Sequence, residues 1–139
     1  MTQKEKELLL RDLSARLPYG VILNTPNGNK PLLALVSSKE YNTIIEYDDY
    51  HGFENDITEW EGGDVELIKP YLRPLSSMTE EEEIGYDATF ATIIYDDGHR
   101  ESTMTYESFD WLNAHYFDCR GLIEKGLALP APKGMYDNQ

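Results

Sequence analysis

The stretch SFDWLNAHYFDCRGLIEKGLALPAP, residues 108–132, is the most apolar window of the chain and mixes helix-forming, aromatic and turn-forming residues. It predicts one helix from about Glu107 to Ala114 or Tyr116. A second helix is predicted over 119–125, with Asp118 as its N-cap and Gly126 ending it. The apolar side chains expected to close the core are Phe109, Trp111, Leu112, Tyr116, Phe117, Leu122, Ile123, Leu127 and Leu129.

The first residues of the chain predict an amphipathic helix. Thr2 and Glu5 have the spacing of a capping box, in which each side chain satisfies a free backbone N–H group of the first turn. Apolar residues then recur at helical spacing up to Leu17, and Pro18 and Gly20 end the pattern. We expect this helix to lie on a sheet.

Five short strands in meander order are predicted next, over residues 21–23, 31–37, 41–47, 57–60 and 65–68. Asn27-Gly28 is the preferred dipeptide of a two-residue hairpin turn, and a turn centred there would pair Leu23 with Leu32 and Val21 with Ala34. Gly62-Gly63 would form another turn that pairs Trp60 with Val65. Strands this short curl readily, so we expect an SH3-like small barrel or a strongly bent sheet.

The segment 69–75 contains two prolines, Pro70 and Pro74, which argue against a central strand because each lacks a ladder donor. A packed connector is therefore expected there. Thr79 and Glu82 form a second capping box, which explains the glutamate run of residues 80–83 as the start of a helix.

Asp97-Gly98 predicts a further hairpin between residues 89–96 and 99–106. The register of a two-residue turn would place Tyr95 opposite Arg100 and Ala91 opposite Met104. Together these patterns predict an α+β fold in one domain, residues 1–139. Residues 1–75 would form the helix and small barrel, and residues 76–139 a helix–hairpin–helix region packed on it, ending in the two short C-terminal helices.

The chain carries a formal net charge of −14, which is its strongest compositional signal. Residues 40–68 contain ten acids and no Lys or Arg, and residues 80–110 contain ten acids and only Arg100. Such a field repels nucleic-acid phosphates and anionic membranes, so we expect no direct binding to either. A basic protein partner or divalent cations remain compatible with it.

The remaining composition predicts a cytoplasmic protein. Cys119 is the only cysteine, which excludes an internal disulfide and a cysteine-based zinc cluster. The first ten residues lack an apolar core of signal-peptide length, and no run approaches the roughly 18 apolar residues of a membrane span. The oligomeric state is left open by the sequence.

Two segments, KPYLRPLSSMTEEE (residues 69–82) and DWLNAHYFDCRGLIEKGLALPAPKGMY (residues 110–136), resemble a group of small uncharacterised proteins. ARLPYGV (residues 15–21) is similar to the opening of the same group. The group recurs in gut Bacteroidales genomes, and its members are expected in the phages or integrated elements of these bacteria. No activity is established for it. The resemblance implies a bacterial or phage cytoplasmic context and carries over no catalytic residue.

No nucleotide-binding or serine-hydrolase motif occurs, and we assign no catalytic residue, cofactor or metal site. The loop around Gly52 lacks the acidic residues that calcium-loop spacing would require before and after the glycine. Amphipathic rings among carboxylates suit a protein-recognition surface. The predicted partner-binding residues are Tyr47, Asp48, Asp49, Tyr50, His51, Phe53, Glu54 and Trp60.

The leading hypothesis is therefore a non-enzymatic binding or regulatory module that uses this acidic, tyrosine-rich face against a basic protein. A second hypothesis is an acidic phage-type protein that mimics DNA, which requires carboxylates spaced along one elongated face. A third is a small metal-dependent hydrolase that uses Asp48, Asp49, His51 and Glu54. It requires those side chains to converge in a pocket.

Overall fold

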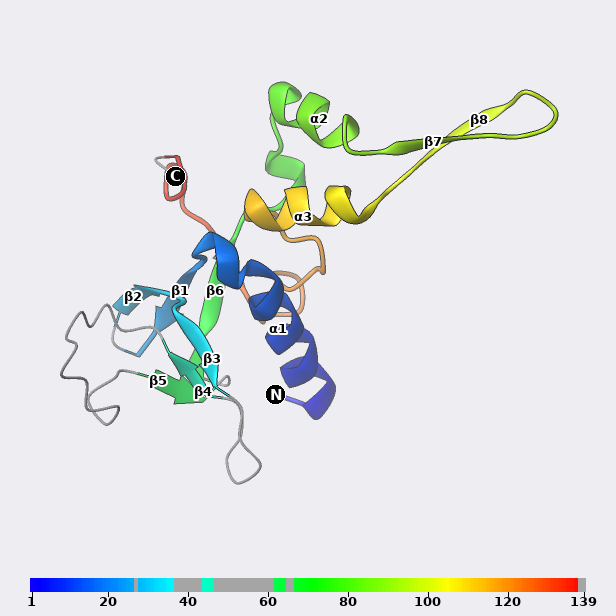
Figure 1. The fold of residues 1–139 in the computed structure, drawn as a ribbon. Helices are drawn as coiled ribbons and strands as arrows, with labels where there is room; N and C mark the ends of the chain where they lie inside the picture. The colour runs from blue at the N-terminus through cyan, green and yellow to red at the C-terminus, as the bar shows by residue number, and fades with distance from the viewer. Residues whose placement is uncertain (27, 37–43, 47–61, 65–66, 138–139) are drawn as a thin grey trace.

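The computed structural model describes residues 1–26, 28–36, 44–46, 62–64 and 67–137 (Figure 1). The helices are α1 (Gln3–Arg16), α2 (Glu80–Asp87) and α3 (Tyr106–Ala114), with short 3₁₀ turns at Leu17–Tyr19 and Leu75–Ser77. The strands are β1 (Ile22–Thr25), β2 (Gly28–Pro31), β3 (Ala34–Val36), β4 (Ile44–Glu46), β5 (Gly62–Asp64), β6 (Lys69–Leu72), β7 (Ala91–Ile94), β8 (Arg100–Thr103) and β9 (Leu129–Pro130). The α+β prediction is confirmed.

The described strands form three sheets. Their orders are β2-β1-β6-β9, β3-β4-β5 and β7-β8, and every pairing is antiparallel except the parallel pair β6-β9. The described part of the chain contains no closed barrel, and its strands do not form the expected five-stranded meander. The first sheet instead includes β6 and β9, although β9 is far from the other strands in sequence. The C-terminal stretch returns to the sheet there and pairs with Tyr71 and Leu72.

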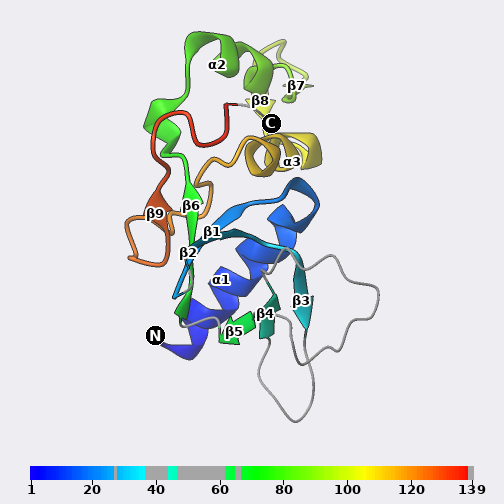
Figure 2. The same ribbon diagram turned by 90° about the vertical axis from the view of Figure 1, so that its left-hand side faces the viewer.

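The core lies where α1, the first sheet and the C-terminal stretch meet (Figure 2). Its fully buried side chains come from all three parts, for example Leu13, Leu23, Leu72 and Leu122, each 0% exposed. Most of the aromatic C-terminal stretch contributes as predicted, with Leu112, Tyr116, Phe117 and Leu127 buried. Phe109 is an exception, since it is 48% exposed.

Both predicted capping boxes are confirmed. Thr2 and Glu5 exchange backbone-to-side-chain bonds at the start of α1, and Thr79 and Glu82 do so at the start of α2. α1 ends at the Leu17–Tyr19 turn, and Gly20 follows in the left-handed region with φ of 73°. None of the helices in the described residues has the length and apolarity to cross a membrane.

The β1–β2 register differs from the predicted one. Thr25 lies opposite Gly28, and Leu23 lies opposite Lys30 instead of Leu32. The chain therefore reverses one position earlier than predicted, with Pro26 at the start of the turn, where its fixed φ is favourable. The Thr25 hydroxyl donates to the Gly28 carbonyl at 2.7 Å and supports this closure. The predicted strand 31–37 is also divided, because β2 and β3 belong to different sheets.

Gly62 and Gly63, predicted as a turn, lie inside β5 and pair with Glu46 and Ile45 of β4. An antiparallel ladder uses backbone groups alone, so a glycine pair is compatible with a strand as well as with a turn. The expected Trp60–Val65 pairing lies outside the described residues, as does most of the predicted strand 41–47.

The prediction that segment 69–75 is not a central strand is wrong, because β6 lies between β1 and β9. Pro70 removes one donor, and the surrounding backbone groups supply several other bonds. The Leu72 carbonyl accepts from Ala131 N–H at 2.7 Å, while Arg73 donates to the Tyr116 carbonyl and accepts from Asp118 N–H. In a strand of four residues these bonds outweigh the missing donor.

The β7–β8 hairpin has a three-residue loop, Asp96-Asp97-Gly98, in which Tyr95 N–H donates to the His99 carbonyl and Gly98 N–H donates to the Tyr95 carbonyl. Ile94 therefore lies opposite Arg100, and Ala91 opposite Thr103, one residue away from the predicted pairs. Gly98 adopts φ of 89°, as the last position of such a loop requires. The Asp97 carboxylate accepts the His99 N–H at 3.0 Å, which favours this longer loop.

The predicted helix at 119–125 is absent, and turns occupy these positions. Gly121 has φ of 71°, a left-handed conformation that interrupts a right-handed helix. The Asp118 carboxylate still binds the backbone N–H groups that follow it, because it accepts from Leu122 N–H at 2.8 Å and from Ile123 N–H at 3.0 Å. Gly126 lies in the left-handed region with φ of 75°, where it follows a turn and not the predicted helix.

Candidate functional site

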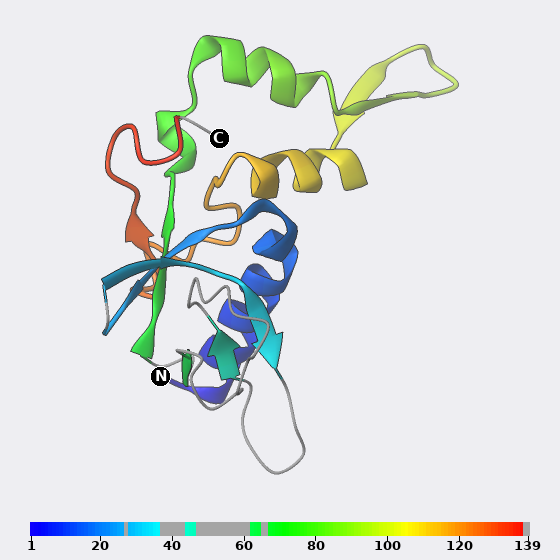
Figure 3. The same ribbon diagram turned by 60° about the vertical axis from the view of Figure 1, so that its left-hand side comes forward.

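The β7–β8 hairpin extends away from the rest of the chain as an arm, which we define as residues 91–104 (Figures 1 and 3). Every residue of the arm is exposed, on both faces of the hairpin. Ile94 is 65% exposed, Ile93 41% and Tyr95 40%. A two-stranded hairpin with no covering layer has little to stabilise it by itself, so its base must be held by other contacts.

Three hydroxyl residues hold the base of the arm between α2 and α3, and we call them the hydroxyl clasp: Thr89, Thr105 and Ser108. The Thr105 hydroxyl donates to the Thr89 carbonyl at 2.8 Å. The Thr89 hydroxyl lies 2.8 Å from Ser108 Oγ, which also accepts the Thr105 N–H at 2.9 Å. Ser108 is fully buried. The clasp positions the arm relative to both helices.

The tip of the arm is ordered by side-chain contacts. The Tyr95 and His99 rings stack with centroids 4.1 Å apart, and the Tyr95 hydroxyl donates to Glu101 at 3.0 Å. His99 contacts Asp97 through its backbone N–H and its ring Nδ1. These hydrogen bonds, the backbone one first, lower the pKa of the Asp97 carboxyl. The tip therefore presents a defined arrangement of an aromatic pair and acids.

Apolar side chains are also exposed on the helices that flank the arm. Ile84 of α2 is 72% exposed and Tyr106 of α3 is 89% exposed. The segment that contains them is acidic, since residues 80–110 include ten Asp and Glu and one basic residue, Arg100. Exposed apolar groups with a charged surround are typical of a protein-interaction surface.

Two hollows open at the base of the arm, and they share Met104 and Phe109 as walls. The first, of about 590 Å³, is lined by Leu75, Met78, Glu83, Tyr86, Asp87, Met104, Phe109, Leu112 and Cys119. The second, of about 460 Å³, is lined by Ala15, Met104, Thr105, Tyr106, Phe109, Asp110, Asn113 and Arg120. The first hollow is apolar inside and carries two carboxylates, which is the combination that binds an amphipathic partner.

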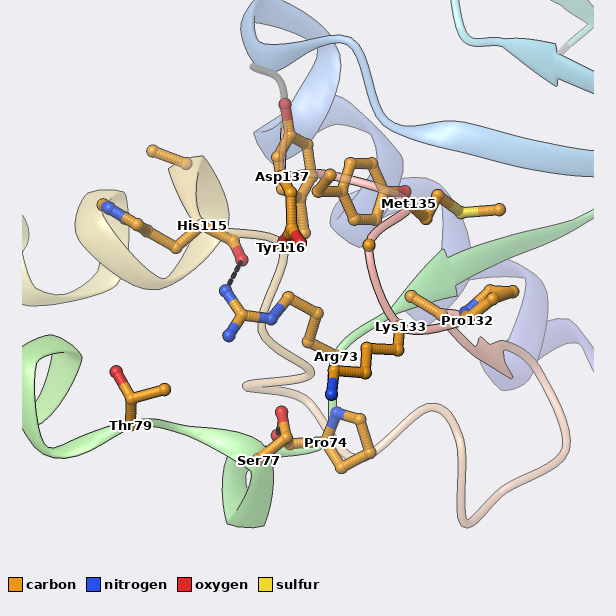
Figure 4. Close-up of a pocket in the computed structure, with 14 residues that line it drawn as sticks. Arg73, Pro74, Ser77, Thr79, His115, Tyr116, Pro132, Lys133, Met135 and Asp137 are labelled. Atoms are coloured by element: carbon orange, nitrogen blue, oxygen red, sulfur yellow. Dashed lines mark hydrogen bonds between the residues drawn. The ribbon is translucent and has the colours of Figure 1, made fainter.

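A further pocket, of about 640 Å³, lies between β6, the end of α3 and residues 131–137 (Figure 4). Its Arg73 guanidinium makes two bonds of 2.7 Å to Glu82 and lies 4.2 Å above the Phe117 ring. The hydrogen bonds from Arg73 lower the pKa of the Glu82 carboxyl to about 2. This arginine joins β6 to α2, so its role in the fold accounts for its position.

The aromatic wall of the same pocket also has a structural role. Tyr116 and Tyr136 stack with centroids 3.7 Å apart, and the Tyr116 hydroxyl donates to the Tyr19 carbonyl at 2.6 Å. The Tyr136 hydroxyl donates to the Tyr71 carbonyl and accepts the Ile22 N–H, and burial raises its pKa. The pocket is thus lined mainly by groups that bind one another. The arm, whose side chains are exposed, is therefore the better candidate for a functional site.

A buried ionic cluster lies beneath α3. Asp12 and Arg16, both 0% exposed, pair at 2.9 Å, and Arg120 reaches Asp12 at 2.7 Å. Arg16 also donates to the Phe117 carbonyl at 2.6 Å. Cys119 lies beside the two arginines, and its burial raises the pKa of the thiol. A thiol held in its neutral form is a poor nucleophile, so this cluster connects α1 to the C-terminal stretch without indicating chemistry.

The predicted partner-binding residues, from Tyr47 to Trp60, lie outside the described residues, and so do the acids of the hydrolase hypothesis. Elsewhere in the described part of the chain, no three His, Cys, Asp or Glu side chains are grouped as metal ligands. The sequence located the hairpin of the arm but missed its exposure. The polar return strand Ser102-Thr103 was the available signal, because it leaves no second apolar face to bury.

Comparison of the chain with protein-family models, with curated proteins and with solved structures gives no match in any of the three. The arm and its flanking helices, with their exposed apolar side chains and acids, are therefore the best candidate for a functional surface.

Proposed function

We propose that this chain is a non-enzymatic protein-binding module that presents the arm and its flanking helices to a basic protein partner. The exposure of the whole arm is the observation that carries the proposal. An uncovered hairpin that displays Ile93, Ile94 and Tyr95 leaves apolar area in water, which a partner would remove. Both edges of a two-stranded sheet are also free to pair with another strand.

Charge favours a basic partner over a second copy of the chain. Residues 80–110 carry ten acids against Arg100, and each molecule has a net charge of −14. Two arms brought together would place like charges opposite each other, whereas a Lys- or Arg-rich surface would be attracted. The tyrosine-rich face from Tyr47 to Trp60 belongs to the same proposal as a second acidic contact region. The resemblance to the Bacteroidales group directs the search for the partner to these bacteria and their phages.

The test is site-specific photo-crosslinking in bacterial cells, followed by binding measurements on the purified pair. A photoreactive side chain at Ile94 of the arm is expected to capture a protein with a basic surface. The same group at Glu7, an exposed position on α1 that belongs to neither proposed contact region, is the control and should not. Affinity should then fall by about tenfold or more between low and high salt, since the pairing is electrostatic.

The arm variant Ile93→Ser/Ile94→Ser should weaken binding of the captured partner by about tenfold or more, which is about 1.4 kcal/mol. Leu33→Ser, which also removes an exposed apolar side chain (47% exposed), should change it less than twofold, a difference of about 0.4 kcal/mol. Crosslinking of Ile94 only to a second copy of the chain, or to a partner with no basic surface, would overturn the proposal. So would equal binding by the arm and control variants.

A further inference from the structure

Beyond contact with the arm, we propose that the first hollow receives an apolar side chain from a Lys- or Arg-rich amphipathic helix of the partner. The inference rests on the proposed function and names the element of the partner that is recognised. Three features of the hollow carry it: its walls, its acidic rim and its position between two helices.

The walls of the hollow suit an apolar anchor. Met78, Met104 and Phe109 line it, and the last two are exposed to 37% and 48% of their surface. Its volume of about 590 Å³ exceeds that of any single side chain, so it has room for a large apolar group and a neighbouring one. Methionine side chains are flexible and polarizable, and they adapt to anchors of different shape. Phe109 and Met104 therefore present apolar surface at the opening of the hollow that an apolar anchor would cover.

The acidic rim suits a basic helix. Glu83 and Asp87 both line the hollow and stand four residues apart on α2, so they lie on the same side of that helix. Neither has a basic partner among the described residues. Their separation along the axis is about 6 Å, the same rise that separates residues i and i+4 of any helix. A helix lying along α2 would therefore place two Lys or Arg residues opposite the two carboxylates.

The position of the hollow favours a helix in a groove over a bound strand. α2 and α3 form its two sides, in contact through Tyr86 and Trp111, whose rings are 5.5 Å apart. No strand edge lines it, since its residues come from α2, α3 and the segments next to them. Apolar anchors at helical spacing are the recognition mode that such a groove accepts.

Cys119 makes the inference directly testable, because it lines the hollow and is the only cysteine of the chain. The probe is a synthetic peptide of about 18 residues with Leu and Lys at amphipathic helical spacing. Because burial raises the pKa of the Cys119 thiol, alkylation is followed at a pH alkaline enough to ionise it. At saturating peptide, alkylation of Cys119 in the full chain is expected to slow by about fivefold or more, because the occupant covers the residue in the hollow. A peptide with the same lysines and every Leu replaced by Ala should leave the alkylation rate unchanged.

Two variants with the same change in net charge distinguish the effect of the acidic rim on peptide binding from the effect of the overall negative charge of the protein. Glu83→Lys/Asp87→Lys should weaken peptide binding by about tenfold or more. Glu7→Lys/Glu124→Ala/Asp137→Ala makes the same change in net charge at exposed positions that do not line the hollow, and should weaken binding less than threefold, about 0.65 kcal/mol. Circular dichroism of both variants checks that each remains folded.

The inference is overturned if the peptide binds and Cys119 stays as reactive as in the free protein. It is also overturned if the Ala peptide protects equally, or if both variants lose binding to the same extent. Failure here is distinguishable from failure of the proposed function, which is read from crosslinking at Ile94. Capture at Ile94 without Cys119 protection would support the arm as a contact surface and contradict binding in the hollow. Cys119 protection without capture at Ile94 would support binding in the hollow and contradict the arm as a contact surface.

Discussion

At the scale of single residues, Tyr116 shows how packing offsets a local cost. It has φ of 64°, a left-handed conformation that costs a non-glycine residue roughly 1 kcal/mol. It follows the last residues of α3, where Phe117 N–H donates to the Leu112 carbonyl and Tyr116 N–H to the Asn113 carbonyl. This is the pattern of a Schellman motif, which usually takes glycine at that position. The stacked Tyr136 ring and the bond to Tyr19 offset the strain.

Glu82 is the residue for which pH gives the clearest expectation. Its folded pKa of about 2 lies below the ordinary value of 4.5, mainly because Arg73 donates two bonds to it. Its contribution to stability is therefore complete above about pH 4.5 and is lost as the pH falls toward 2. Glu82→Gln should lower the free energy of unfolding near neutral pH by about 1 to 2 kcal/mol.

Urea denaturation across this pH range measures the effect. The difference between the wild type and Glu82→Gln should shrink as the pH drops below 4.5, since both carry a neutral side chain at the acid end. Glu81→Gln, an exposed change in the same helical turn, should alter stability by less than about 0.5 kcal/mol. A difference that stays constant with pH would show that the Arg73–Glu82 pair does not account for the shift.

At the scale of elements, the arm and the first sheet should differ in how they open. The arm has no buried side chain, whereas β6 contributes Pro70 and Leu72 to the buried interior. Amides of the arm should therefore exchange through local opening, and amides that bond to β6 through opening of the whole core.

Ile68→Val, a change at a side chain 1% exposed, should destabilise the core by about 0.5 to 1.5 kcal/mol. It is expected to speed hydrogen exchange of the Ala131 amide, which bonds to the Leu72 carbonyl, by about two- to tenfold. The Tyr95 amide, which bonds to His99 in the arm, should exchange at an unchanged rate. Equal acceleration at both amides, measured by NMR, would mean that the arm opens only when the core does.

At the scale of the whole molecule, the charge of −14 should act against the compact state through self-repulsion. Raising NaCl from about 20 mM to about 200 mM shortens the screening length severalfold, so the urea midpoint should rise. The variant Glu80→Gln/Glu81→Gln/Glu107→Gln starts with less repulsion and should gain less from the same salt. A midpoint that falls with salt would indicate that attractive ion pairs outweigh repulsion in this protein.

Some local features of the chain were determined by the sequence alone. The two capping boxes, the ends of α1 and the position of α3 all follow from residues within a few places of one another, because cap bonds join residues three or four apart. Asp97-Gly98 likewise located the arm. Its loop length needed the structure, because the same dipeptide serves loops of two and of three residues.

Only the tertiary structure decided which strands pair and which surface stays open. Pro70 lies in a central strand because Leu23, Tyr116 and Ala131, all distant in sequence, bring backbone bonds to the chain around it. Whether an apolar residue such as Phe109 is buried depends on what packs against it, and the described residues leave it 48% exposed. Long-range pairing and burial are set by the sum of many weak contacts, whereas a cap is set by two neighbouring side chains.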